Sequence, residues 1–292
     1  LRCCDHRQAD LLVVQDPKSK VNKSTEVDVD IREIGIYKFV ARDSGHHELV
    51  LESPLHNATI ALMDLDAVQS ILEVYMERFN VLKENRMNLL TVIFKNHGAR
   101  SGANIAHPHS QVVALRVMPS ELRLSLERAQ RYFNDHGCCL YCKMIRHEVQ
   151  MDSPLNSSKS RVVVESSCFV ALIPYAATVP YETHIFPRRH ADTIGGLTVE
   201  ELADLARILR DVLRRLYGLL QNPDFSYVFR NAPYVHEGCT FYHWHVVVTP
   251  RMFDRTAFEI CTSVPINSML PERCAENLRS YDWRDGAMGS VG

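Results

Sequence analysis

The elements that the sequence predicts come in the same order in both halves of the chain, and this repetition limits the folds open to it. Each half reads as strands, a long amphipathic helix, a further strand, and finally a strand rich in histidine. In the first half, strands are predicted at 36–40, 46–53, 88–96 and 111–117, with helices at 63–85 and 119–135. In the second half, strands are predicted at 161–166, 168–174, 182–187, 224–231 and 242–250, with a helix at 197–221. This order predicts an α+β fold with helices packed on antiparallel sheets.

Composition divides the chain at two places. Residues 1–35 are polar and aperiodic, so little structure is expected there, and the segment could be truncated because it opens on Leu1 rather than Met. The Ser- and Pro-containing stretch 151–160 separates the two halves. We therefore expect a poorly structured N-terminal segment, a first repeat over 36–150 and a second repeat over 151–292.

The overall composition excludes several classes of protein. The 292 residues are 46% hydrophobic and 23% charged, with a formal net charge of −2, as in ordinary soluble globular proteins. A chain without a basic field is not expected to bind nucleic acid. No apolar run reaches the roughly 18 residues of a membrane span, and no apolar signal-peptide core is visible. We therefore expect no membrane partner and a cytoplasmic location.

A C-x-x-C pair, Cys139 and Cys142, stands out among nine cysteines and fourteen histidines. Such a pair is typical of a metal site or a redox site. Two histidines would complete a closed Cys2His2 zinc set, namely His190, the last residue of PRRH, and His243, the first histidine of YHWH. Unliganded thiols and a redox pair remain the alternatives.

The loop FKNHGARSGANIAHPHSQ, residues 94–111, has the composition of an anion-binding loop. Gly98 and Gly102, with small neighbours, let backbone N–H groups approach an anion closely. Asn96, Asn104 and Gln111 add neutral polar donors. A phosphate or pyrophosphate would suit this loop, and a long hairpin loop with turn glycines is the alternative.

Two histidines flank Pro108 at the end of this loop. On a strand, His107 and His109 would point to the same face. One of them could bind metal while the other faces a phosphate. His109 could attack phosphorus if its far ring nitrogen were held by a carbonyl acceptor, which would fix the tautomer. The alternative is a pair of polar strand histidines with no chemical role.

The segment NHGARSGANIAHPHSQ resembles the active-site segment of the galactose-1-phosphate uridylyltransferase family, within the HIT superfamily. Further stretches agree, and they are HHELVLESPLH, GCCLYC, FVALIPYAATVPYETHIFPRRH, YHWHVVVTP and AFEICTSVPINSMLPE. The resemblance spans roughly residues 45–280, and the downstream pieces are most similar to the short members and to the related ADP-glucose phosphorylases. It implies two HIT-like repeats, paired in a homodimer.

The resemblance also implies roles for individual residues. His109 matches the nucleophile that becomes a covalent histidine–nucleoside monophosphate, and Gln111 matches the residue that contacts the bound phosphate. The residues that match the phosphate loop are Asn96, Ser101, Gly102, Ala103 and Asn104. The residues that match zinc ligands are His56 and His107 at a first site, and Cys139, Cys142, His190 and His243 at a second.

The implied activity is that of a UDP-glucose:hexose-1-phosphate (galactose-1-phosphate) uridylyltransferase, acting by ping-pong through a histidine–UMP intermediate. Its partners would be a UDP-sugar and a hexose 1-phosphate, and its place would be in galactose metabolism. Pro108 favours this over the ADP-glucose phosphorylases, which often carry Ser there. HIT hydrolases carry a third alternating histidine, where this chain has Gln111. An inactive zinc- and nucleotide-binding HIT protein is the non-enzyme alternative.

The front of the chain departs from the family pattern. The family's N-terminal C-x-x-C, which completes the first zinc site, is not visible, and Cys3 and His6 show only a C-x-x-H spacing in an unrelated context. The first site is therefore expected to be incomplete unless residues precede this chain. Cys261 and Ser263 stand where glycines are common in the short members. His245 is expected to be a partly exposed strand histidine.

Overall fold

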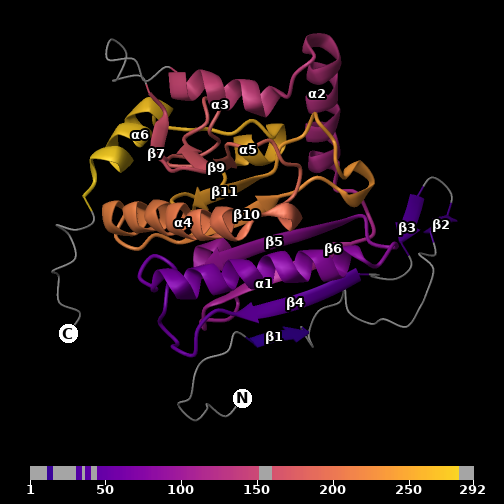
Figure 1. Cartoon of the computed structure of the whole chain (residues 1–292), viewed down its shortest axis with the longest axis horizontal. Coiled ribbons are helices and arrows are strands. Elements are labelled where there is room, and N and C mark those ends of the chain that lie inside the picture. The colour runs from indigo at the N-terminus through magenta and orange to yellow at the C-terminus, as the bar shows by residue number, and fades with distance from the viewer. Residues whose placement is uncertain (1–11, 16–30, 35–36, 41–44, 151–159, 283–292) are drawn as a thin grey trace.

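The computed structural model describes residues 12–15, 31–34, 37–40, 45–150 and 160–282. Its centre is one antiparallel sheet to which both halves contribute (Figure 1). The first half supplies β1 (Leu12–Gln15), β4 (Gly45–Leu51), β5 (Leu90–His97) and β6 (His109–Leu115), with helices α1 (Leu65–Lys83), α2 (Ser120–His136) and α3 (Leu140–Gln150). The second supplies β7 (Val162–Glu165), β8 (Phe169–Leu172), β9 (Thr183–Pro187), β10 (Phe225–Arg230) and β11 (His245–Pro250), with helices α4 (Val199–Leu219), α5 (Ala257–Thr262) and α6 (Pro271–Ser280). A separate hairpin joins β2 (Ile31–Ile34) to β3 (Tyr37–Val40).

The strand order relates the two halves by an approximate two-fold axis. The order in the sheet is β1-β4-β6-β5-β10-β11-β9-β8-β7. The halves meet where β5 pairs with β10, with Phe94 opposite Val228. On either side of this pair, β6 and β11 carry the histidines, and β4 and β9 follow them outward. The repetition of elements predicted from sequence is thus present in the architecture.

Helices α1 and α4 lie side by side across one face of the sheet (Figure 1). Helix α4 begins at a capping box, because Thr198 accepts from the Glu201 N–H at 3.1 Å while the Glu201 carboxylate accepts from the Thr198 N–H at 3.0 Å. Its apolar stripe is buried in the core that it shares with α1. Alternate residues of β8 point to the other face, where Val170 and Leu172 contact Ile145 of α3.

The sequence prediction was wrong in some details. Strands β1 and β2 lie within residues 1–35, where little structure was expected. The predicted strand at 36–40 corresponds to β3, which pairs with β2 outside the main sheet, and β1 takes the place beside β4. Helices α3, α5 and α6 were not predicted. These elements are short, and tertiary contacts can decide the conformation of such segments.

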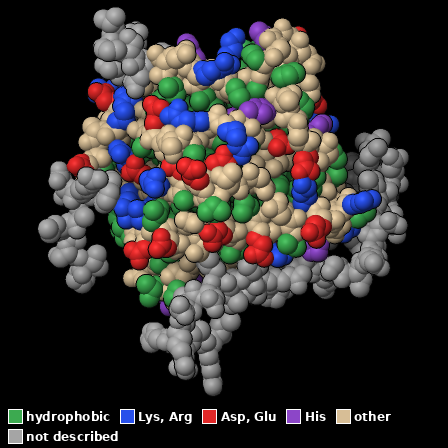
Figure 2. Space-filling view, in the orientation of Figure 1, with side chains coloured by type: hydrophobic (Ala, Val, Ile, Leu, Met, Phe, Trp, Pro, Cys, Tyr) green, Lys and Arg blue, Asp and Glu red, His purple; other side chains and the backbone are tan. Residues whose placement is uncertain are grey.

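The surface over α1 and α4 carries interspersed acidic and basic side chains, with no broad field of one sign in this view (Figure 2). Within the described residues, no helix combines the length and the apolar character that a membrane crossing requires.

Helix α5 ends at Ser263, which adopts a left-handed conformation with φ of 57°. Glycine adopts this conformation without the Cβ clash that Ser263 carries. We expect Ser263→Gly to raise the free energy of unfolding by about 1 kcal/mol, measured from urea denaturation midpoints. Ser125→Gly in the middle of α2 is the control, and should lower it by about 0.5 kcal/mol. A loss of stability in both variants would contradict this reading of Ser263.

Candidate active site and metal centre

His109 is the first residue of β6, and its side chain is held in one orientation. The ring Nδ1 lies 2.8 Å from the backbone carbonyl oxygen of His107. A carbonyl oxygen can only accept, so Nδ1 carries the proton of the neutral ring and Nε2 keeps a free lone pair. His109 is 4% exposed. This is the arrangement that the sequence analysis set as the condition for nucleophilic attack by His109.

His107 and His56 lie against each other beside this strand. Nε2 of His107 donates to the Ser53 carbonyl oxygen at 2.6 Å, which turns its Nδ1 toward Nδ1 of His56 at 3.0 Å. The structure therefore brings together the two residues expected at a first metal site. Among the residues that the structure describes, no cysteine joins them. Cys3 and His6 lie outside the described residues.

Gln111 receives a hydrogen bond from a residue that the sequence analysis left without a role. Nε2 of His47 lies 2.8 Å from Oε1 of Gln111. Because the amide oxygen accepts, the Gln111 amino group is directed away from His47 and its N–H groups can donate elsewhere. In the β4–β6 register, His47 pairs with Val113 and Leu49 with Gln111. His47 is thus the diagonal neighbour of Gln111, a relation that the strand pairing gives and the bare sequence does not.

The glycine loop after β5 is held by its own hydrogen bonds. The N–H groups of Ser101 and Ala103 donate to the Gly98 carbonyl, and that of Gly102 donates to the Ala99 carbonyl. The Arg100 N–H donates to the Asp224 carboxylate at 2.6 Å. These four amides are therefore engaged within the protein, and anion binding by the loop stays a prediction.

The side-chain amides of the loop lie near its surface. Asn96 is half-buried, and its side-chain nitrogen lies close to Gly102, while Asn104 is exposed. Gly98 has a φ of 82°, and a Cβ there would lie 1.9 Å from an Asp224 carboxylate oxygen. Glycine is therefore required at position 98, and Asp224 is a site residue that sequence reasoning missed.

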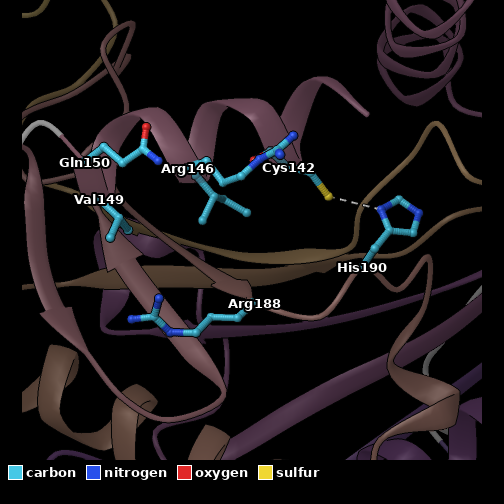
Figure 3. Close-up of a pocket in the computed structure, with 7 residues that line it drawn as sticks. Cys142, Arg146, Val149, Gln150, Arg188 and His190 are labelled. Atoms are coloured by element: carbon cyan, nitrogen blue, oxygen red, sulfur yellow. Dashed lines mark hydrogen bonds between the residues drawn. The ribbon is translucent and has the colours of Figure 1, made fainter. Parts of the chain in front are cut away.

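Four residues of the second half form a compact metal-binding group. The ligand atoms of Cys139, Cys142, His190 and His243 all lie within 4.8 Å of one another. The Cys142 Sγ lies 3.3 Å from Nδ1 of His190, as Figure 3 shows, and 3.3 Å from Nδ1 of His243. Ligands about 2.0 to 2.3 Å from a tetrahedral ion stand about 3.3 to 3.8 Å apart. The four residues fit such an ion, as the sequence predicted.

Neighbouring groups orient these four residues for metal binding. Nε2 of His243 donates to the Pro187 carbonyl at 2.9 Å and Nε2 of His190 to the Cys239 carbonyl at 3.3 Å, so each ring offers Nδ1. The hydrogen bond from Cys142, with smaller contributions from both histidines, lowers the pKa of the Cys139 thiol. A hollow of about 380 Å³ beside them is lined by Arg146 and Arg188 among others (Figure 3).

The histidine geometry of the first half recurs in the second. His243 donates to the Pro187 carbonyl, as His107 donates to the Ser53 carbonyl. The second ligand follows at the same spacing, because His190 is the third residue after Pro187 and His56 is the third residue after Ser53. Nδ1 of His245 lies 3.1 Å from the His243 carbonyl oxygen, which makes His245 the counterpart of His109.

His245 is buried, so the expectation that it is partly exposed was wrong. The ring of Tyr141, on α3, lies 5.4 Å from that of His245, and His184 stacks on it at 5.4 Å. Burial holds the pKa of His245 well below its ordinary value, so the ring is neutral. Helix α3 therefore packs over this histidine through Tyr141.

Comparison with known proteins identifies the family. Two family models match, the galactose-1-phosphate uridyl transferase N-terminal domain at residues 18–119 and its C-terminal domain at 125–258. The crystal structure of an ADP-glucose phosphorylase from Arabidopsis thaliana with bound ADP-glucose superposes with a TM-score of 0.75 at 30% identity, covering 82% of this chain and 74% of that one. The chain belongs to the galactose-1-phosphate uridylyltransferase family. The resemblance stated from sequence and the expected α+β fold with HIT-like repeats are both confirmed.

Two curated relatives show how much of the chain is shared. An ADP-glucose phosphorylase of Arabidopsis thaliana is 31% identical over 237 residues, which are 80% of this chain and 64% of that protein. A galactose-1-phosphate uridylyltransferase of Thermotoga maritima is 29% identical over 244 residues, which are 80% of this chain and 74% of that protein. The aligned part of this chain therefore spans less than two thirds of the first relative and about three quarters of the second.

The four-residue metal group gives a testable prediction. We expect Cys142→Ser to remove about one equivalent of bound transition metal per chain, measured by elemental mass spectrometry of the purified protein. Thermal stability should fall with it, because the free energy of metal binding contributes to folding. Cys261→Ser, at an exposed thiol on α5, should change neither quantity. Equal metal content in wild type and Cys142→Ser would rule out this assignment.

Proposed function

We propose that the chain is a nucleotidyltransferase in which His109 takes up a nucleoside monophosphate covalently and passes it to a phosphate-bearing acceptor. The observation that carries this proposal is the hydrogen bond from Nδ1 of His109 to the His107 carbonyl oxygen, at 2.8 Å. That bond leaves Nε2 unprotonated and gives the ring one defined orientation. The arrangement suits a nucleophile that attacks phosphorus.

The proposed reaction has two displacements. Nε2 of His109 forms a bond to the α-phosphorus of a nucleoside diphosphate sugar, and the bond from that phosphorus to the bridging oxygen breaks. The sugar 1-phosphate leaves with the electron pair. In the second step a phosphate oxygen of the acceptor attacks the same phosphorus and releases His109. In this proposal the Gln111 amino group donates to a non-bridging oxygen, where charge develops in both steps.

We propose UDP-glucose as the donor and galactose 1-phosphate as the acceptor. The matches to both galactose-1-phosphate uridyl transferase domain models support this choice, as does the Thermotoga maritima relative. Pro108, at the centre of the His-Pro-His segment, supports it as well.

The second candidate is an ADP-glucose phosphorylase, in which inorganic phosphate receives an adenylyl group from the same histidine. The Arabidopsis thaliana relative, at 31% identity, and its ADP-glucose complex favour this candidate. The two reactions share their histidine chemistry and differ in the base of the donor and in the acceptor.

We further propose that zinc occupies the group formed by Cys139, Cys142, His190 and His243. Two thiolates and two imidazoles in a closed set are the donors that structural zinc prefers. The ion would tie the start of α3 to the segments after β9 and before β11. It would thereby stabilise the fold, while the chemistry stays with His109.

The assembly that we propose is a homodimer. The segment from Phe253 to Leu270 carries several large apolar side chains that are more than half exposed, namely Phe253, Phe258, Ile260, Val264, Ile266 and Leu270. Such clustering of exposed apolar groups is typical of an interaction surface. Sedimentation velocity gives the mass in solution, and a monomer at all concentrations would exclude the dimer.

The proposed chemistry predicts a covalent adduct. We expect intact-mass spectrometry to show addition of a uridylyl group after incubation with UDP-glucose without acceptor. His109→Ala should form no adduct and should lower turnover by a factor of about 10³ or more. His245→Ala, at the covered counterpart, is the control, and the variant should still form the adduct.

Other outcomes of the same experiment assign the alternatives. An adenylyl adduct from ADP-glucose in place of a uridylyl adduct would identify the phosphorylase. A metal-loaded protein that forms no adduct with UDP-glucose, UDP-galactose or ADP-glucose would be a nucleotide-binding protein without this activity.

The His47–Gln111 hydrogen bond gives a double-mutant test. Gln111→Ala should slow adduct formation about 100-fold, because a donor to the phosphate is lost. His47→Phe should slow it about 10-fold, because the Gln111 amide loses its orientation. The double variant should be no slower than Gln111→Ala, since both changes remove one interaction. His46→Phe is the matched control, and rates that multiply in the double variant would show that the two residues act independently.

A further inference from the structure

A buried ion pair lies directly beneath the strand that carries His109. Lys95, on β5, and Glu52, which follows β4, are 1% and 4% exposed. The Lys95 Nζ lies 2.5 Å from Oε2 of Glu52. Lysine and glutamate are rarely this buried, and a buried pair is weak evidence for stability because both charges lose their hydration. The pair therefore calls for a role beyond holding the core together.

Each of the three residues from Pro108 to Ser110 is bonded to this pair. The backbone N–H of Glu52 donates to the Pro108 carbonyl at 3.1 Å. The ammonium group of Lys95 donates to the His109 carbonyl at 3.1 Å. The hydroxyl of Ser110 donates to the Glu52 carboxylate.

Two tyrosines complete the same network. The Tyr75 hydroxyl donates to the Ser110 hydroxyl and lies 2.8 Å from the hydroxyl of Tyr227. Burial raises the pKa of both Tyr75 and Tyr227, so both remain neutral. The charge of the network therefore resides on Lys95 and Glu52.

The second half of the chain shows what the fold needs at this place. Gln111 and Val247, each two residues after the histidine of its own strand, pair with Phe94 and Val228 respectively. Phe94 therefore corresponds to Val228, and the counterpart of Lys95 is Phe229. The counterpart of Ser110, next to His109, is Val246, next to His245. Phe229 and Val246 are both buried. The second half thus forms the same strands and the same histidine geometry over an apolar layer. The ion pair is present in the first half, where α3 does not pack over the histidine.

We infer that Lys95 and Glu52 are positioning residues that hold the backbone of 108–110, so that Nδ1 of His109 stays on the His107 carbonyl and Nε2 stays aimed at the phosphorus. Successive residues of a strand point to opposite faces. Ser110 lies in the buried network, so the His109 ring lies on the other face, and neither Lys95 nor Glu52 touches it. Lys95 and Glu52 therefore act on the His109 ring through the backbone of residues 108–110. The inference rests on the proposed function for the identity of the nucleophile.

The test removes both charges together. Lys95→Met with Glu52→Gln leaves no unpaired buried charge, and the buried Phe229 at the counterpart of Lys95 shows that the repeat folds with an apolar residue there. We expect near-wild-type thermal stability, an adduct formation rate at saturating donor that is about 10- to 100-fold lower, and little change in KM. A purely structural role predicts that the rate follows the stability.

A matched control comes from a second buried ion pair. Arg161 and Glu148 lie 2.6 Å apart in a region away from β6. Arg161 also pairs with Glu272 at 2.7 Å, so the control changes all three residues, Arg161→Met with Glu148→Gln and Glu272→Gln. It should leave the adduct formation rate of the folded protein unchanged, and an equal loss of rate in it and in the Lys95→Met/Glu52→Gln variant would overturn the inference.

A measurement independent of activity separates this inference from the proposed function. ¹⁵N spectra of histidine-labelled protein report the tautomer of His109, assigned by comparison with His109→Ala. The wild-type ring should be a single Nδ1–H tautomer, and the Lys95→Met/Glu52→Gln ring should exchange between tautomers. An unchanged tautomer overturns the inference even if the wild type forms no adduct. Should the double variant not fold, Lys95→Arg keeps both charges but displaces the donor to the His109 carbonyl, and a wild-type rate and tautomer there would equally overturn it.

Discussion

The pairing of β5 with β10 is the contact on which the rest of the site depends. It joins the two repeats into one sheet, with Phe225 opposite His97 at one end and Phe229 opposite Ile93 at the other. Because the strands are antiparallel, the residue before β10 must lie beside the residue after β5. That geometry brings Asp224 to Gly98 and lets its carboxylate accept from the Arg100 N–H. The glycine loop of the first repeat is therefore shaped by a side chain of the second, and neither repeat makes the site alone.

Duplication placed the same histidine arrangement on both sides of this axis, and the surroundings then gave the two copies different properties. His109 and His245 each use a backbone carbonyl two residues earlier to fix Nδ1. Helix α3 covers His245, and desolvation keeps its pKa low. His109 instead lies above a buried ion pair. The two copies therefore differ in what packs on each face of the sheet, with the strand geometry unchanged.

Residues close together in sequence, or of unusual type, were the ones that could be predicted. The His-Pro-His segment, the C-x-x-C pair with His190 and His243, and the Thr198 cap depend on short-range pattern and on chemistry that few residue types supply. The structure brings all four metal residues together, as expected. What escaped prediction depends on strand register. The bond from His47 to Gln111 and the bonds of Lys95 to Glu52 and to the His109 carbonyl join positions 64, 43 and 14 residues apart. A lysine in an apolar strand gives no sign of its partner until the neighbouring strand is known.

Most of the groups that decide between the two candidate reactions must lie outside the strand that carries His109, and beside that histidine only Pro108 bears on the choice. Both begin with attack by the same imidazole nitrogen on an α-phosphorus, so the groups that orient His109 and Gln111 serve both equally. The base of the donor and the identity of the acceptor enter only through contacts made elsewhere. Selectivity between two substrates is the difference between their binding free energies, and contacts that both complexes share cancel in that difference. A match over residues 94–111 therefore supports the proposed histidine chemistry more than it supports either donor.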